Sequence, residues 1–356
     1  PSDLQARVAR ALSQLKNPRL GEDVLSAGMV SDLAVDEQGQ VSFTFRLDRE
    51  DPGALARDAR KAVQAVAGVT AVRVNVADTS AAGGAAPRGA PGSVPPPPTP
   101  VELPHLGRVV AISSGKGGVG KSTVSANLAV ALARAGHRVG LMDADIYGPN
   151  IPRMMGVDRK PDVRGQKIQP LEAYGVKLIS LGLIVERDAP AIWRGPIIMK
   201  VIGQFVRDVE WGQLDYFLVD LPPGTGDAQL SLAQTVHIRT AIIVTTPQEV
   251  AVGDSLRGAK MFERVGVPVL GVIENMSYFV CPHCGERTEI FLAGGGVRLA
   301  DELGVPLLGQ VPLQARLADL ADEGRPIVVA DPGSPAGQAL EAIARRVTDA
   351  LSAAAR

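Results

Sequence analysis

The chain contains little cysteine, few aromatic residues and no long hydrophobic run, and each shortage excludes a class of protein. Only 2 of its 356 residues are cysteine, which excludes a fold held together by disulfides. Aromatic residues make up 4%, so we expect a core of mainly aliphatic side chains. No uncharged apolar run approaches the roughly 18 residues that a transmembrane helix needs. We therefore expect no membrane partner.

Neither sign of charge is in excess. The 37 Lys and Arg residues balance 38 Asp and Glu residues, which gives a formal net charge of −1. A general nucleic-acid binder normally carries a basic surplus, so we expect no nucleic-acid partner. Charged residues at Asp3, Arg7, Arg10 and Lys16 interrupt every apolar stretch of residues 1–30, which is not typical of a signal peptide. Together with the low cysteine content, this indicates the reducing cytoplasm.

Composition and periodicity divide the chain into three parts. Residues 78–104 are rich in Ala, Gly, Ser and Pro, which predicts a linker. Residues 1–77 show helical spacing and alternating strands in the order α-β-β-α-β, which predicts a small α+β domain. In residues 105–356, short apolar runs alternate with helical segments such as 121–134 and 249–265. This predicts a doubly wound α/β domain with a mostly parallel sheet, whose ligands bind at the carboxyl ends of the strands.

A phosphate-binding motif follows the first strand of the large domain. It has the spacing G-x-x-x-x-G-K-[ST] between a strand and a helix, which is the context of a P-loop. Backbone N–H groups would surround the phosphates, Lys121 would reach the β- and γ-phosphates, and the Ser122 hydroxyl would bind Mg²⁺. The predicted nucleotide-binding residues are Gly115, Lys116, Gly117, Gly118, Val119, Gly120, Lys121, Ser122 and Thr123.

Acidic residues follow two further predicted strands. Asp143 and Asp145 come after the second strand, and Asp220 ends another apolar strand before a Pro/Gly loop. Phosphoryl transfer needs one acid in the Mg²⁺ shell and a group that orients the attacking water. We assign Asp220 to the Mg²⁺ shell and Asp145 to the water, with Asp143 in support. Asp227, in the same loop as Asp220, is either part of this site or a helix cap.

Both cysteines belong to one Cys-x-x-Cys motif, formed by Cys281 and Cys284. Structural zinc and iron–sulfur clusters usually take four ligands, and one chain supplies two thiolates. A symmetric dimer would supply four and could hold one [4Fe–4S] cluster or one zinc ion. His283, between the cysteines, is not expected to be a ligand. A redox dithiol and a pair of inert loop cysteines remain alternatives.

These motifs together carry a family resemblance. The segments SSGKGGVGKSTVSANLAVALARAGHRVGLMDADIYGPNIPRMMG, LVDLPPGTGDAQLSL and IENMSYFVCPHC occur in order, and residues 108–356 resemble the Mrp/ApbC iron–sulfur carrier P-loop ATPases. These are relatives of MinD, ParA and the nitrogenase iron protein. Residues 1–77 resemble the small MIP18-like domain of iron–sulfur assembly factors. That domain often has a reactive cysteine before its second helix, but residues 47–53 contain none, which argues against thiol chemistry by this domain and leaves a docking role open.

The resemblance implies a homodimer that hydrolyses ATP slowly and carries a bridging [4Fe–4S] cluster between scaffold proteins and recipient apo-proteins. Lys116 matches the deviant Walker A pattern, in which this lysine reaches the nucleotide of the facing subunit and contributes to catalysis. Asn275 matches a residue that contacts the adenine. As metal ligands, the resemblance implies Cys281 and Cys284 for the cluster.

The main alternative is a ParA- or MinD-like positioning ATPase that acts on DNA or a membrane. The chain ends in EAIARRVTDALSAAAR, which has no aromatic anchor for a membrane surface. The balanced charge does not favour DNA binding. The sequence therefore favours the carrier function over the positioning function.

Overall fold

The computed structural model describes residues 2–36, 38–47, 51–52, 54–78, 103–145, 148–183, 195–224, 229, 233, 236 and 238–353. The chain forms two compact units, Pro1–Val94 and Pro95–Arg356. Nearly all of the predicted linker lies outside the described residues, and so does Asp227. Among the described residues, no helix is both long enough and apolar enough to cross a membrane.

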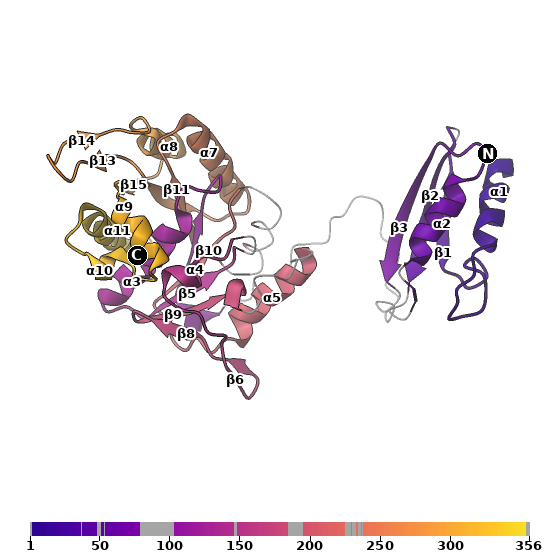
Figure 1. Ribbon diagram of the computed structural model, residues 1–356, viewed down its shortest axis with the longest axis horizontal. Helices are drawn as coiled ribbons and strands as arrows, with labels where there is room; N and C mark the ends of the chain where they lie inside the picture. Colours follow the sequence, from indigo (N-terminus) through magenta and orange to yellow (C-terminus); the bar gives the residue numbers. More distant parts are fainter. Residues whose placement is uncertain are drawn as a thin grey trace. The chain divides into compact units, whose positions relative to one another are not determined.

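The first unit is a three-stranded sheet with two helices, in the α-β-β-α-β order that the sequence predicts (Figure 1). The central strand β2 pairs antiparallel with β1 and parallel with β3. Phe43 and Phe45, on the same face of β2, are buried against Val8 and Leu12 of α1 and Val63 of α2. The elements are α1 Ser2–Ser13, β1 Val30–Val35, β2 Gln40–Leu47, α2 Leu55–Gln64 and β3 Ala71–Asp78.

The second unit is built on an eight-stranded sheet with the order β15-β12-β11-β4-β10-β5-β9-β8. All neighbouring strands are parallel except β8, which pairs antiparallel with β9 at the edge. The mostly parallel sheet is therefore confirmed. The strands are β4 Arg108–Ser113, β5 Val139–Asp143, β8 Leu171–Ala173, β9 Val176–Ser180, β10 Tyr216–Asp220, β11 Thr240–Thr245, β12 Val269–Glu274 and β15 Leu307–Gln310.

Helices cover both faces of this sheet, as expected for strands that are apolar on both sides. Val110 and Ile112 of β4 pack in one core with α3 and α11, whereas Val109 and Ala111 pack in a second core with α5, α7 and α8. The helices are α3 Lys121–Arg134, α4 Ile151–Met154, α5 Gly195–Asp208, α7 Glu249–Arg264, α8 Gly295–Leu303, α9 Ala315–Asp322, α10 Ile327–Ala330 and α11 Pro335–Ala353, with short 3₁₀ turns η2 Pro104–Leu106 and η3 Leu181–Leu183.

Two small hairpins extend the second unit. Strands β6 (Val163–Arg164) and β7 (Lys167–Ile168) form one, and β13 (Phe279–Val280) and β14 (Arg287–Thr288) form the other. The second hairpin projects from the unit near α8, and the segment that joins its strands contains both cysteines (Figure 1). Neither hairpin is predictable from the sequence, because strands of two residues show no periodicity.

Candidate functional site

The P-loop connects the central strand β4 to the N-terminus of α3. Gly118 and Gly120 have φ values of +80° and +81°, which residues with a side chain rarely adopt. The loop encloses a pocket of about 170 Å³. Its lining includes nearly all of the predicted loop residues together with one predicted acid: Ser114, Lys116, Gly117, Gly118, Val119, Gly120, Lys121, Ser122, Thr123, Asp145, Asn150, Met154 and Pro223.

Gly115 begins the motif but does not line this pocket. It packs against α7, where a Cβ on Gly115 would come within 2.1 Å of the backbone carbon of Asp254 and 2.2 Å of the Ser255 nitrogen. Only glycine allows this close approach, so Gly115 is needed for the packing of the P-loop against α7.

Lys121 lies between two of the predicted acids. Its Nζ is 2.7 Å from Oδ2 of Asp220 and 3.8 Å from Oδ2 of Asp145. The lysine side chain is 5% exposed and Asp220 is fully buried, so water screens this charge pair only weakly. The structure thus brings these three residues together at one edge of the sheet, and their roles stay predictions.

Asp220 is also bound by two hydroxyl groups from α3. Ser122 Oγ donates to Oδ2 and Ser125 Oγ donates to Oδ1, each at 2.6 Å. Ser125 is a site residue that the sequence analysis misses, because nothing in the P-loop motif extends to its position. One turn of α3 therefore places Lys121, Ser122 and Ser125 around a single carboxylate.

Asp143 and Asp145 occupy different environments although they are two positions apart. Asp143 is fully buried, pairs in register with Asp220, and accepts hydrogen bonds from Ser180 Oγ (2.9 Å) and the Asp145 N–H (3.1 Å). Burial, together with the nearby charge of Asp220, raises the pKa of Asp143 to about 8. The raised pKa favours the protonated form of Asp143, whereas Asp145 lines the P-loop pocket and accepts from the Gly148 N–H.

Asn275 does not line the P-loop pocket. Its side-chain amide donates to the backbone carbonyl of Val119 at 2.8 Å, and 3% of the residue is exposed. The structure thus places Asn275 directly behind the P-loop backbone. The adenine contact implied by the family resemblance stays a prediction.

The cysteine pair lies in the turn between β13 and β14. Cys281 N–H donates to Glu286 O and Gly285 N–H donates to Cys281 O, both at 2.9 Å, and Gly285 has a φ of +73°. Hydrogen bonds from the backbone N–H groups of Cys284 and His283, and one from the Cys284 side chain, lower the pKa of Cys281. Cys281 is half-buried and Cys284 is exposed.

The backbone N–H groups of this turn are directed at the Cys281 sulfur. A lowered pKa favours the thiolate, which is the form that binds metals. Within the described ranges, no group of three or more His, Cys, Asp or Glu side chains has the arrangement of a metal site. One copy of the hairpin therefore supplies two thiols.

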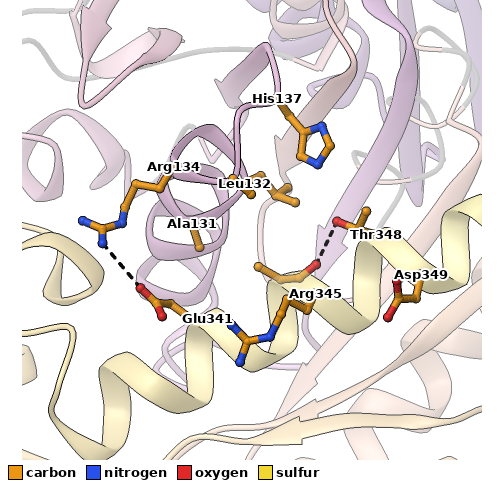
Figure 2. A pocket seen from close by; sticks show the side chains of 10 residues that line it. Ala131, Leu132, Arg134, His137, Glu341, Arg345, Thr348 and Asp349 are labelled. Atoms are coloured by element: carbon orange, nitrogen blue, oxygen red, sulfur yellow. Dashed lines mark hydrogen bonds and ion pairs between the residues drawn. The ribbon is translucent and has the colours of Figure 1, made fainter.

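A second pocket, of about 390 Å³, lies at the opposite end of α3. Figure 2 shows its lining between the C-terminal turns of α3 and the helix α11. Two of its charged side chains, Arg134 and Glu341, form an ion pair at 3.7 Å. The Thr348 hydroxyl donates a hydrogen bond to Ala344 O at 3.0 Å. It contains none of the predicted site residues.

Comparison with known proteins agrees with this arrangement. Residues 105–348 match the family described as NUBPL iron-transfer P-loop NTPase, and residues 5–76 match the family described as iron-sulfur cluster assembly protein. The chain is 44% identical to an iron-sulfur cluster carrier protein of Synechocystis, over 98% of both chains. It is 48% identical to an iron-sulfur protein required for NADH dehydrogenase in Arabidopsis thaliana mitochondria, over 71% of this chain and 82% of that one.

A solved structure resembles the second unit. It is a nucleotide-binding protein of Archaeoglobus fulgidus in complex with ADP, 40% identical, with a TM-score of 0.56 over 62% of this chain and 88% of that one. The full-length relative, the two family matches and the P-loop fold agree with one another. The chain therefore belongs to the family of iron–sulfur cluster carrier P-loop NTPases, with an N-terminal iron–sulfur assembly domain.

Proposed function

We propose that this protein is an ATP-hydrolysing carrier of [4Fe–4S] clusters that works as a homodimer. Cys281 and Cys284 of each copy bind one cluster, which is the cargo, and the protein delivers it to recipient apo-proteins. The observation that carries this proposal is the hairpin itself: two thiols in a turn whose backbone N–H groups face a cysteine sulfur, with no further ligands close by among the described residues. Four thiolates then require two copies.

Exposed apolar side chains near the hairpin support a protein contact on this side of the unit. Ile290 and Leu292 follow β14, and Val297 lies at the start of α8, with exposed fractions of 49%, 62% and 41%. Exposed apolar side chains that gather in one region are typical of interaction sites. A second copy that covers them would bring its own cysteine pair to the shared cluster.

The P-loop pocket supplies the ATP chemistry. Lys121 leaves Asp220 and neutralises the β- and γ-phosphates, while the N-terminus of α3 directs backbone N–H groups at them. Asp145, which lines the pocket, accepts a hydrogen bond from the attacking water and orients it. Lys116 lines the same pocket and, in a dimer, would reach the nucleotide of the partner subunit.

The oxygen atoms around Asp220 fit a magnesium ion. The Ser122 hydroxyl and the Asp220 carboxylate are hard oxygen donors 2.6 Å apart, at the N-terminus of α3 beside the nucleotide pocket. Ser122 would bind the ion directly, and Asp220 would hold its hydration shell. When bound, Mg²⁺ neutralises charge on the phosphate oxygens.

Anaerobic reconstitution with iron and sulfide tests the carrier proposal. We expect a broad visible absorption band, about four irons per dimer, and a dimer mass by light scattering. The double variant Cys281→Ser/Cys284→Ser should lose the iron and the absorption band but retain ATP binding. His283→Ala serves as the matched control in the same turn and should keep the cluster.

Other outcomes would contradict the proposal. A colourless dimer with one zinc ion would indicate a structural metal, and loss of the cluster in His283→Ala would mean that the ligand set is wrong. A protein that binds no metal but hydrolyses ATP in the presence of DNA or lipid vesicles would instead indicate a positioning ATPase.

A further inference from the structure

Glu274, the last residue of β12, and Asn275, the next residue, bond in two directions: to the segment that precedes the cysteine hairpin and to the P-loop. Asn275 donates its side-chain amide to Val119 O in the P-loop, at 2.8 Å and 156 positions away in the sequence. Glu274 accepts a 2.5 Å hydrogen bond from Ser277 Oγ, on the segment that leads to Cys281. The end of β12 therefore lies between the nucleotide loop and the cysteine hairpin.

The contact between Asn275 and the P-loop leaves no free space. A Cβ on Gly120, the residue after Val119, would come within 2.1 Å of the Asn275 amide nitrogen. The backbone N–H of Asn275 donates to Thr245 O at 2.8 Å, which fixes it to the neighbouring strand β11. A displacement of the peptide between Val119 and Gly120 must therefore move the Asn275 side chain.

The Glu274 side chain connects the segment after β12 with β15 and α8. Its fully buried carboxylate accepts hydrogen bonds from Ser277, from Gln310 of β15 at 2.8 Å, and from the backbone N–H of Gly296 at the start of α8. The positive end of the α8 dipole adds to this stabilisation of the charge. Because the three donors share one carboxylate, movement of one changes the hydrogen bonds of the others.

The segment between Glu274 and the hairpin is held at defined points. Ser277 N–H donates to Val311 O at 3.0 Å, and Leu313 N–H donates to Tyr278 O at 2.7 Å. Met276, between Asn275 and Ser277, has a φ of +53°, a conformation that residues other than glycine adopt at a cost of about 1 kcal/mol or more. The hairpin strand β13 begins two residues after Ser277, so a shift of Ser277 reaches Cys281 over a short, hydrogen-bonded path.

We propose that Asn275, Glu274 and Ser277 form the link through which nucleotide binding at the P-loop repositions the cysteine hairpin. This inference rests on the proposed function, because it gives the route by which ATP acts on the cluster. Lys121 must leave Asp220 to reach a phosphate, and the carbonyl bound by Asn275 belongs to Val119, two residues before Lys121 in the P-loop. Ser277 is a positioning residue, since its hydroxyl contacts neither the P-loop nor a cysteine.

Thiol alkylation in the full-length, metal-free, reduced protein tests this link. The rate of iodoacetamide modification at Cys281 and Cys284 is measured by mass spectrometry, with and without a non-hydrolysable ATP analogue and Mg²⁺. We expect the analogue to change the rate by about fivefold in the wild type, at the lower end of ordinary allosteric coupling. In Ser277→Ala the change should fall below about twofold, with unchanged affinity for the analogue. The control Thr288→Val, in β14 of the same hairpin, should respond like the wild type.

The outcomes separate the two proposals. A wild-type protein whose thiols do not respond to the analogue would contradict ATP coupling itself, and with it the link. A full response in Ser277→Ala would overturn the link alone and leave the proposed function standing.

A second measurement needs no variant, in case Ser277→Ala does not fold. Hydrogen exchange of wild-type peptides that contain Ser277 and Leu313 should change when the analogue binds, because their amides hold the connecting segment in place. Unchanged exchange in both peptides would overturn the link.

Discussion

Lys121 and Asp220 form an ion pair at 2.7 Å in which 5% of the lysine and none of the aspartate side chain is exposed. The lysine is thus bound to a residue that it must leave before it can reach a phosphate. Asp220 keeps two hydroxyl donors, Ser122 and Ser125, when Lys121 moves away. In the proposed function, nucleotide binding would exchange one partner of Lys121 for another without leaving Asp220 unbonded.

Replacing Lys121 tests whether the Lys121–Asp220 ion pair serves both ATP binding and the stability of the fold. We expect Lys121→Ala to lose measurable ATP binding and to lower the free energy of unfolding by about 3 kcal/mol, because it leaves a buried carboxylate without its cation. Calorimetric titration with ATP and chemical denaturation measure the two effects. Lys260→Ala, at an exposed position of α7, should change neither. Wild-type ATP affinity in Lys121→Ala would contradict the assignment of Lys121 to the ATP site.

The neighbouring acids Asp143 and Asp145 should respond differently to the same substitution. Because burial favours the uncharged form of Asp143, which an amide resembles, Asp143→Asn should keep ATP hydrolysis within about threefold of wild type. Asp145→Asn should reduce the hydrolysis rate by about 100-fold, because the amide cannot orient the attacking water in the same way. Single-turnover hydrolysis with saturating Mg²⁺ distinguishes the two variants. Equal losses would show that the roles are wrongly divided.

Acid stability should depend on the pair Asp215–Arg138, which joins the starts of β10 and β5. Hydrogen bonds from Arg138 lower the pKa of Asp215 to about 2 from an ordinary 3.8. A lowered pKa in the folded state stabilises the fold above about pH 4, and this contribution disappears between about pH 4 and pH 2. Asp215→Asn should remove that dependence.

The size of this effect is limited by solvent, since 34% of the Asp215 side chain is exposed. We expect less than about 1 kcal/mol at neutral pH. Unfolding by urea, measured from pH 2 to pH 7, should show convergence of wild type and variant at the acid end. Divergence as the pH falls would contradict the sign of the shift.

Two glycines should respond in opposite directions to alanine. Gly253 lies within α7 and nothing is within 4 Å of its Cβ position, so Gly253→Ala should stabilise the protein by about 0.5–1 kcal/mol. Gly120→Ala meets the Asn275 amide at a φ of +81°, so it should destabilise the protein and weaken ATP binding. Thermal unfolding with and without ATP measures both. A lower melting temperature for Gly253→Ala would contradict the finding that the Cβ position of Gly253 is open.

The P-loop part of the candidate site was predictable from the sequence, because the motif and the apolar strands beside it are local sequence patterns. The P-loop spacing identifies Lys121 and Ser122, and the apolar run before Asp220 places that acid at a strand end. The carboxyl ends of parallel strands meet at one edge, which predicts that these side chains come together. The predicted helix at residues 121–134 also matches α3 at both ends.

Residues whose role depends on strand register were not predictable. Ser180 reaches Asp143 because β9 pairs with β5 in register, and Gln310 reaches Glu274 because β15 pairs with β12. A single sequence carries no signal for such a pairing. Glu274 ends an apolar strand as Asp220 does, but no motif distinguishes a structural carboxylate from a catalytic one.

The exposure of Cys284 in the turn of a short hairpin has a consequence for delivery. In a single copy, a thiolate of a recipient protein would reach this position without any opening of the fold, and in the proposed dimer it would approach along the edge of the interface. In the proposed carrier, transfer would then proceed by ligand exchange, and its rate would rise with the recipient's concentration and thiolate fraction, because the thiolate is the form that binds a metal. A cluster bound there would be accessible to dioxygen from the same side. The hairpin therefore favours rapid delivery over long storage.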